Sequence, residues 1–181
     1  MKLYILRHGE TDWNVQWKMQ GQTDIPLNEK GRAQAAEAAE RLKDTPFDAV
    51  YSSPLIRAYE TAETIAAPHG LKVIKDERLK EMSFGEFEGT TPDYNKINPS
   101  RELFFTAPEK YIPSGGETID EAEDRCRDFV SFLRTKDYEN VLLVTHGALA
   151  RALIGAVKNV PHEHFWDTGV LSNCGTIVIE I

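Results

Sequence analysis

The sequence predicts an α/β fold of three layers, α/β/α, in which a mostly parallel central sheet carries helices on both faces. Short apolar runs alternate with longer amphipathic stretches along the 181 residues. Two of the apolar runs, residues 3–6 and 141–145, lead into a histidine that is followed by glycine, His8 and His146, and Arg7 precedes the first of them. Ligands of open α/β sheets bind beyond the carboxyl ends of the strands. These polar side chains are therefore expected to share one site.

The first half of the chain is predicted to supply three strands and two helices. After a strand at residues 2–6, residues 28–43 form an alanine-rich helix for which Asn28 is a suitable N-cap. A short strand is expected at 48–51, and another at 71–74. Between them, Ser53 followed by Pro54 begins a helix, because a capping residue before proline at the first helical position is the favoured order. Apolar residues recur at helical spacing in this second helix, at Leu55, Ala58, Ala62, Ile65 and Ala66.

The second half begins with a segment that differs from the rest of the chain. Residues 83–117 have weak periodicity and hold many Gly, Pro and aromatic residues, so we interpret them as an excursion from the core that covers the ligand site. Thr118 and Glu121 then form a capping box for a long helix. A strand at 141–145, a helix around 148–157 and a last strand at 176–179 complete the alternation. The buried face of the long helix is predicted as Ile119, Ala122, Cys126, Phe129, Val130 and Leu133.

Composition limits the possible partners. A chain of 181 residues is expected to form one domain, residues 1–181. The formal net charge of −8 argues against nucleic acid or an anionic membrane as the partner, and it makes any cluster of cations informative. The two cysteines, Cys126 and Cys174, lie far apart and are expected to be buried, reduced thiols. The first apolar run is too short for a signal peptide and no stretch is long enough to span a membrane, so a cytoplasmic protein is expected.

Arg57 is the next informative residue, because it falls in the first turn of the helix that Ser53 begins. A cation there opposes the positive end of the helix dipole, at a cost of roughly a few tenths of a kcal/mol. A solvated arginine tolerates this cost. Alternatively, an anion sits at that helix N-terminus and is held by the backbone amides and the guanidinium. The strand-end residues Arg7, His8 and His146 favour the anion.

Three acidic residues follow the third predicted strand and are candidates for proton transfer at the site. They are Glu81, Glu86 and Glu88. Each is equally compatible with a charge on the surface, so the residue types alone leave all three open.

Six sequence blocks run almost from end to end of the chain in the order found in a known family. They are Arg7-His8-Gly9-Glu10-Thr11 with Asn14; Gly21 to Leu27 with Gly31; Ser52-Ser53-Pro54 with Arg57, Ala58 and Thr61; Glu81 with Phe84-Gly85 and Glu88-Gly89; Gly115-Gly116-Glu117 with Arg125; and Thr145-His146-Gly147. On these blocks the chain resembles the histidine phosphatase superfamily, in the branch of the cofactor-dependent phosphoglycerate mutases. Phe87 stands where tryptophan is usual. The resemblance implies a phosphoglycerate mutase-like fold.

The resemblance also implies a role for each site residue. His8 would be the nucleophile that forms a phosphohistidine, and nearby cations favour the neutral imidazole that can attack phosphorus. Glu81 would protonate the leaving oxygen and then deprotonate the hydrolytic water. The family pattern places further residues around the phosphoryl group: Arg7, Arg57, His146 and Asn14 on its oxygens, with Gln20, Gly21 and Gly147 as additional substrate-binding positions.

The implied activity is metal-independent hydrolysis of a small phosphomonoester, such as a sugar phosphate or an α-ribazole 5′-phosphate-like compound, without a cofactor. A mutase is the main alternative. The mutases that the chain resembles are longer and carry paired arginines in an insertion, whereas residues 90–112 hold the scattered cations Lys96, Arg101 and Lys110. A shorter lid would also exclude water from the phosphoenzyme less well. The pattern is therefore closer to the α-ribazole phosphatases and the broad-specificity phosphomonoesterases.

A metal hydrolase and a non-catalytic binding module have less support. A metal hydrolase would need the His162-Glu163-His164 segment to join the two strand-end histidines around a divalent ion, but this spacing matches no metal motif. A non-catalytic phosphate-binding module is expected to lack a catalytic group, whereas His8, Glu81 and His146 are all present. Glu10 has no role beyond holding nearby cations, and no feature indicates an oligomeric state. Six aromatic residues either line the mouth of the site or pack beneath the excursion: Trp13, Trp17, Tyr94, Phe104, Phe105 and Tyr111.

Overall fold

The central sheet has five strands. In the computed structural model, which describes residues 1–169 and 172–181, they form one sheet in the order β3-β2-β4-β1-β5. The strands are β1 (Lys2–Arg7), β2 (Ala49–Ser52), β3 (Val73–Lys75), β4 (Asn140–Thr145) and β5 (Thr176–Glu180). The pairs β3–β2, β2–β4 and β4–β1 are parallel, and β5 runs antiparallel to β1 at the edge. The predicted mostly parallel sheet is confirmed, with small shifts at the strand ends.

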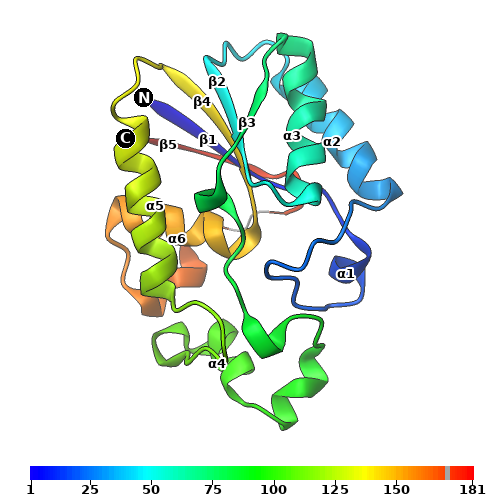
Figure 1. Ribbon diagram of the computed structural model, residues 1–181, viewed down its shortest axis with the longest axis vertical. Helices are drawn as coiled ribbons and strands as arrows, with labels where there is room; N and C mark the ends of the chain where they lie inside the picture. Colours follow the sequence, from blue (N-terminus) through cyan, green and yellow to red (C-terminus); the bar gives the residue numbers. More distant parts are fainter. Residues whose placement is uncertain (170–171) are drawn as a thin grey trace.

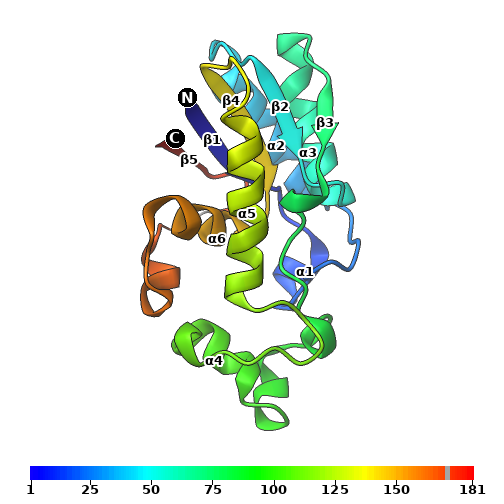
Figure 2. The same ribbon diagram turned by 60° about the vertical axis from the view of Figure 1, so that its left-hand side comes forward.

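Helices cover both faces of this sheet. α2 (Glu29–Leu42) and α3 (Ile56–Ala66) pack on one face, and α5 (Ile119–Leu133) and α6 (Gly147–Lys158) on the other (Figures 1 and 2). Successive residues of a strand point to opposite faces of the sheet, so the side chains of β4 contribute alternately to the two cores under the helices. Leu142 and Val144 belong to the core under α2 and α3, and Val141 and Leu143 to the core under α5 and α6.

The predicted helix starts at Asn28 and Thr118 are confirmed. Asn28 Oδ1 accepts a hydrogen bond from the Gly31 N–H at 2.8 Å. Thr118 and Glu121 form the complete capping box, in which each side chain bonds the other residue's backbone N–H. All six residues predicted for the inner face of α5 are buried. The local sequence therefore determines where these two helices begin.

The start of α3 differs from the prediction. The helix begins at Ile56 rather than at Pro54, and its N-cap residue Leu55 makes no capping hydrogen bond through its side chain. Ser53 remains tied to the sheet, since its N–H donates to Val144 O at 3.0 Å. Its hydroxyl turns to the neighbouring strand end and contacts His146. Packing at the edge of the sheet thus overrides the local capping signal.

The excursion lies beyond the carboxyl ends of the strands, at the bottom of Figure 1. It consists of short helical pieces: η2 (Glu77–Leu79) precedes it, and η3 (Gly85–Phe87), η4 (Pro92–Lys96), α4 (Ser100–Thr106) and η5 (Pro108–Lys110) build it. Such short pieces explain the weak periodicity. Phe87 and Phe104 are almost completely buried, so the excursion is anchored by its own aromatic residues. The other short helices are α1 (Asp12–Val15), η1 (Ala67–His69) and η6 (His162–Asp167).

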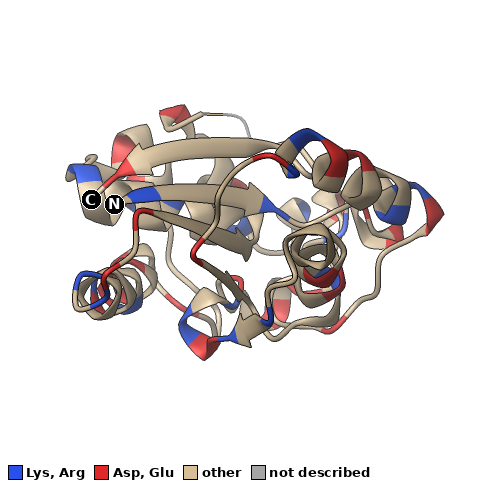
Figure 3. Cartoon of the chain, turned by 90° about the horizontal axis from the view of Figure 1, so that it is seen from above, with Lys and Arg blue, Asp and Glu red and all other residues tan. Residues whose placement is uncertain are grey.

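Charged residues lie mainly on the helices and loops around the sheet, as Figure 3 shows from above. Cys126 and Cys174 are both buried and unpaired, as predicted. Burial raises the pKa of each thiol to about 12, which keeps both protonated at neutral pH. Within residues 1–169 and 172–181, no helix combines the length and the apolar character that crossing a membrane requires.

Candidate active site

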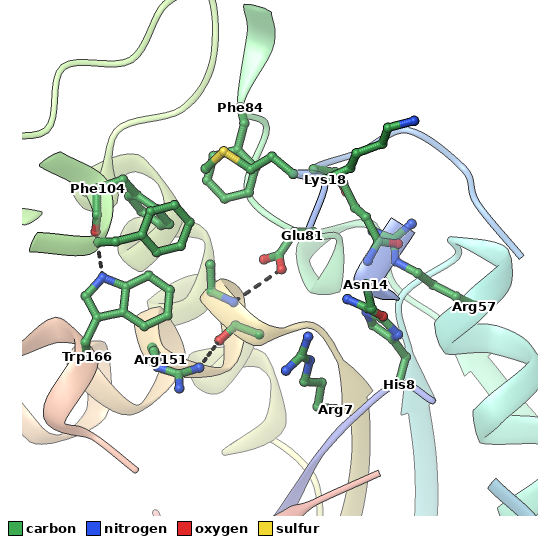
Figure 4. Close-up of a pocket in the computed structure, with 16 residues that line it drawn as sticks. Arg7, His8, Asn14, Lys18, Arg57, Glu81, Phe84, Phe104, Arg151 and Trp166 are labelled. Carbon is green, nitrogen blue, oxygen red and sulfur yellow. Dashed lines mark hydrogen bonds between the residues drawn. The ribbon is translucent and has the colours of Figure 1, made fainter. Parts of the chain in front are cut away.

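Two parallel neighbouring strands bring the predicted histidines together. Arg7 is paired with Thr145 in the register of β1 and β4, so His8 and His146 follow at the same edge of the sheet. Their ring centroids are 5.1 Å apart at an interplanar angle of 61°. A cavity of about 280 Å³ opens at this edge (Figure 4). Apart from His146, its lining contains every residue predicted for the site: Arg7, His8, Asn14, Gln20, Gly21, Arg57, Glu81 and Gly147.

His8 is held by its own backbone neighbour. Its Nδ1 lies 2.6 Å from the carbonyl oxygen of Gly9, and the residue is 2% exposed. Burial, followed by the positive charges of Arg57 and Arg7, lowers the pKa of His8 well below its ordinary value. The imidazole is therefore neutral at physiological pH. Gly9 permits this placement because a Cβ there would lie 2.4 Å from the backbone oxygen of Gly31.

His146 contacts His8 edge to face, is completely buried, and is not part of the cavity lining. Its Nε2 is 2.8 Å from the hydroxyl oxygen of Ser53, and its Nδ1 has no hydrogen-bond partner among residues 1–169 and 172–181. Burial and the charge of Arg57 lower the pKa of His146 well below its ordinary value. The ring is therefore neutral, and one buried ring nitrogen is left for a ligand.

The two predicted arginines converge on His8 from different elements, β1 and α3. Arg57 is fully buried, and its terminal nitrogens donate to the carbonyl oxygens of Gly21 at 2.7 Å and Thr23 at 2.8 Å. Burial lowers the pKa of Arg57 to about 10, although Glu81 opposes the effect. Burial also lowers the pKa of Arg7, again against Glu81. Charges held in this way favour the binding of an anion.

The backbone amides of α3 do not take part as predicted. The carboxylate of Asp24 occupies this helix N-terminus, where its Oδ1 accepts the Ile56 N–H at 2.7 Å. The anion that the sequence led us to expect at these amides is thus part of the chain itself. Arg57 still faces the cavity from the first turn, because its side chain reaches past the helix end to the carbonyl groups of residues 21 and 23.

Thr11 orients two amide side chains of the site. Its N–H donates to Asn14 Oδ1 at 3.1 Å, and its hydroxyl donates to Gln20 Oε1 at 3.0 Å. These bonds use the amide oxygens, so the amide nitrogens are the groups left to donate toward the cavity. Gly21 follows with φ of +53°, and a Cβ there would lie 2.1 Å from Oε1 of Glu88.

Glu81 is fixed at the N-terminus of α6. Its Oε1 accepts the N–H groups of Met82 at 3.0 Å and Leu149 at 2.9 Å, and its Oε2 accepts that of Ala148 at 3.2 Å. Arg125 donates to the Glu81 carbonyl oxygen at 3.2 Å and holds the backbone as well. The residue is 8% exposed and lines the cavity near the cations.

The other acidic candidates have structural contacts instead. Both oxygens of Glu88 accept hydrogen bonds from the 22–23 loop, and Glu86 is exposed and accepts the Ser114 hydroxyl at 2.6 Å. Neither lines the cavity. Glu10 pairs with Lys30 at 2.8 Å and also accepts from the Asn28 side chain. Of the three candidate acids, Glu81 is thus the one that lines the cavity together with His8.

Arg151 and Lys18 also line the cavity, although no sequence motif indicated them. Arg151 is 7% exposed and belongs to α6. A signal was available: Arg151 is the one charged residue between Gly147 and Val157 in an otherwise apolar helix that follows His146 directly. Of the six aromatic candidates, Phe104 and Phe105 line the cavity, and Trp166 joins them.

No group of three or more His, Cys, Asp or Glu side chains suited to a metal ion occurs in the part of the chain that the structure describes. His162 lies 3.5 Å from Glu123, and His164 pairs with Asp167 at 2.9 Å. Both histidines belong to η6, and neither lines the cavity that contains His8.

Known proteins resemble the chain over most of its length. A model of the histidine phosphatase superfamily (branch 1) matches residues 3–181. Phosphoglycerate mutase-like protein 4 of Arabidopsis thaliana is 40% identical over 158 residues, which cover 84% of this chain and 69% of the relative. Glucosyl-3-phosphoglycerate phosphatase of Mycobacterium tuberculosis is 36% identical over 182 residues, which cover 95% and 82% of the two chains.

Solved structures agree with this fold. The mycobacterial glucosyl-3-phosphoglycerate phosphatase complex with VO3 has a TM-score of 0.92 at 35% identity, covering 99% of this chain and 92% of that chain. The α-ribazole phosphatase from Shigella flexneri has a TM-score of 0.88 at 29% identity, covering 100% and 91%. The phosphoglycerate mutase-like α/β fold is therefore confirmed. The chain belongs to the histidine phosphatase superfamily, branch 1, and is a phosphomonoesterase.

Proposed function

We propose that the protein hydrolyses small phosphomonoesters without a metal ion, through a phosphohistidine on Nε2 of His8. The observation that carries this proposal is the contact of 2.6 Å between His8 Nδ1 and the Gly9 carbonyl oxygen. A carbonyl oxygen can only accept, so Nδ1 must hold the ring proton. The lone pair of the neutral ring is then on Nε2, the nitrogen left for the cavity. Neutral imidazole with this tautomer is the form that attacks phosphorus.

Transfer of the phosphoryl group requires positive charge around its oxygens. We assign this task to Arg7 and Arg57, with the amide nitrogen of Asn14. We assign the Ser53 hydroxyl, 2.8 Å from Nε2 of His146, as the donor of that hydrogen bond, so that the ring proton lies on the buried Nδ1 and His146 contributes through it. Donors fixed in advance in a buried site stabilise the transition state without reorganisation.

Glu81 supplies and removes the proton. In the first step the phosphorus–oxygen ester bond breaks, the bond from phosphorus to His8 Nε2 forms, and protonated Glu81 gives its proton to the leaving oxygen. In the second step water attacks phosphorus, His8 leaves, and Glu81 takes the proton from that water. Among the described residues Oε2 accepts one backbone hydrogen bond, from Ala148, and Oε1 accepts two, so Oε2 is the oxygen that we assign to the transfer.

Water, rather than a second hydroxyl of a substrate, is the proposed acceptor. None of the three cations of the excursion, Lys96, Arg101 and Lys110, lines the cavity that contains His8. Lys96 and Lys110 pair with Asp93 and Glu109. Arg101 is 3% exposed, and it donates to Thr90 and Asn95. These contacts support a phosphatase rather than a mutase.

Trapping of the phosphoenzyme tests the proposal. The protein is mixed with a ³²P-labelled phosphomonoester and quenched in alkali, which preserves phosphohistidine. We expect label on the wild-type chain at His8 and none on a His8→Asn variant whose circular dichroism spectrum is unchanged. Hydrolysis without label at His8 would contradict the proposed intermediate.

Metal independence is tested separately. We expect full turnover of p-nitrophenyl phosphate after dialysis against excess EDTA, with no gain when Mg²⁺, Mn²⁺ or Zn²⁺ is added. Loss of activity in EDTA and recovery with one of these ions would show that a metal takes part.

The proposed setting of the reaction is the cytoplasm, with a small molecule as the partner. Two buried cysteines without a disulfide fit a reducing compartment. The net charge of −8 disfavours nucleic acid and anionic membranes as partners. Fractionation of cells that express a tagged chain would test this location.

A further inference from the structure

The hydrogen bonds of the sheet end at His8, and side chains of two helices hold the backbone that follows it. The His8 N–H still bonds the end of β4. The next N–H group, of Gly9, donates to the hydroxyl oxygen of Thr61 in α3 at 3.2 Å. The one after it, of Glu10, donates to Oε1 of Gln34 in α2 at 2.9 Å. Backbone donors that leave a sheet need new acceptors, and here the acceptors come from outside the cavity lining.

These two contacts fix the carbonyl group that orients the His8 ring. That carbonyl belongs to Gly9, and its oxygen lies 2.6 Å from Nδ1 of the ring. It shares one planar peptide group with the Glu10 N–H, so Gln34 fixes the direction in which it points. Thr61 fixes the preceding peptide group through the Gly9 N–H. Because the backbone of glycine rotates more freely than that of any other residue, this restraint has to come from the side chains around it.

The completely buried Thr61 hydroxyl has one possible arrangement of its bonds. Its oxygen accepts the Gly9 N–H, so its single hydrogen donates to the Arg57 carbonyl oxygen at 2.7 Å. The bond to Arg57 is ordinary, because Thr side chains in helices can bond the carbonyl four residues earlier. Thr64 in the same helix bonds Glu60 O in this way at 2.9 Å. The bond to Gly9 joins residues 52 positions apart, and local helix geometry does not account for it.

We propose that Thr61, supported by Gln34, is a positioning residue that keeps the proton of His8 on Nδ1 and so leaves the Nε2 lone pair for phosphorus. Without the hydroxyl, the buried Gly9 N–H would lose its acceptor and would turn toward another one. The adjoining carbonyl would turn with it, and a neutral imidazole that loses this acceptor populates both tautomers. The inference rests on the proposed phosphatase function for its effect on rate, whereas the tautomer can be observed without turnover.

Thr61→Val removes the hydroxyl at nearly constant volume and tests this role. In ¹⁵N NMR of histidine-labelled protein at about pH 8, we expect the Nδ1 and Nε2 signals of His8, assigned with His8→Asn, to move toward each other in this variant. The rate of His8 phosphorylation in a single turnover should fall about 10- to 100-fold, the effect of one unpaired buried donor. The affinity for inorganic phosphate should change little, because other carbonyl groups hold the Arg57 guanidinium.

Three further variants make the test specific. Thr64→Val removes the same local bond from the same helix, and it should leave both the rate and the His8 signals unchanged. Thr61→Ser keeps the hydroxyl and should retain most of the rate. Gln34→Met removes the second acceptor, and it should shift the His8 signals in the same direction as Thr61→Val.

The outcomes separate a failure of the positioning role from a failure of the proposed function. Unchanged His8 signals in Thr61→Val, or an equal loss of rate in Thr64→Val, would overturn the positioning role. A loss of rate without a change of tautomer would leave Thr61 a purely structural part and would overturn it as well. A wild-type chain that forms no phosphohistidine would refute the proposed function instead, and the NMR comparison would then decide the positioning role alone. If Thr61→Val does not fold, Gln34→Met decides in its place.

Discussion

Glu88→Gln should destabilise the protein strongly, whereas Glu86→Gln, two residues away, should have little effect. Oε1 of Glu88 accepts the N–H groups of Gln22 and Phe84, each at 3.1 Å. Oε2 accepts the Thr23 N–H at 3.0 Å and the Thr23 hydroxyl at 2.6 Å. One carboxylate thus joins the loop at residues 21–23, whose carbonyls hold Arg57, to the segment that begins the excursion.

The magnitude follows from the donors that glutamine cannot satisfy. Its amide has one accepting oxygen, and its NH₂ group would face two of the four donors. Two unpaired donors and two weakened bonds amount to about 2–5 kcal/mol of unfolding free energy. For a chain of this size that corresponds to a fall in Tm of about 4–20 °C. Glu86 is exposed and accepts one bond, from Ser114, so its substitution should cost less than about 1 kcal/mol.

Urea denaturation followed by circular dichroism measures both variants on the same scale. The pair is matched, because the two substitutions are chemically identical and lie two residues apart, Glu86 in η3 and Glu88 directly after it. Glu88→Gln should also raise KM for any phosphomonoester, since the carbonyls of residues 21 and 23 position Arg57. Equal unfolding midpoints for Glu88→Gln and Glu86→Gln would refute the assignment of Glu88 as a structural link.

Three further outcomes are expected. Glu81→Gln should lower kcat by about 10²- to 10⁴-fold in a phosphate-release assay; an unchanged rate would move the acid role to another residue. Because the folded-state pKa values of His8 and His146 lie well below 6.5, the unfolded chain binds protons that the folded chain does not. The unfolding free energy from urea titrations should thus fall below pH 6.5, by up to about 1.4 kcal/mol per pH unit per histidine, and a flat profile would contradict this. Gly9→Ala places a Cβ 2.4 Å from Gly31 O and should destabilise the chain by about 1–3 kcal/mol in the same assay.

Local signals predicted those parts of the fold that local interactions determine. The caps at Asn28 and Thr118 bond backbone groups three residues away, so their effect is contained in the adjacent sequence. Ser53 carries an equally clear signal, yet its hydroxyl bonds a histidine 93 positions along the chain. A contact of that range depends on the register of the sheet, which no local pattern contains.

The site was predictable where family motifs and strand ends coincide. His8 and His146 follow adjacent parallel strands, and that arrangement can be inferred from two similar apolar runs. The choice among Glu81, Glu86 and Glu88 could not be made from residue types. It depends on which carboxylate meets the amides at the start of α6, and therefore on how the excursion packs against that helix.

Helix N-termini and arginines of the site bind groups other than those that their chemistry alone would indicate. Helix N-termini are ready binding sites for phosphate. Here Asp24 occupies the N-terminus of α3 and Glu81 that of α6, so neither is open to the substrate. Arginines are usually neutralised by carboxylates, yet Arg57 and Arg151 are held by carbonyl oxygens. Because a carbonyl fixes a guanidinium without cancelling its charge, both arginines keep a full positive charge for the phosphomonoester that enters the cavity.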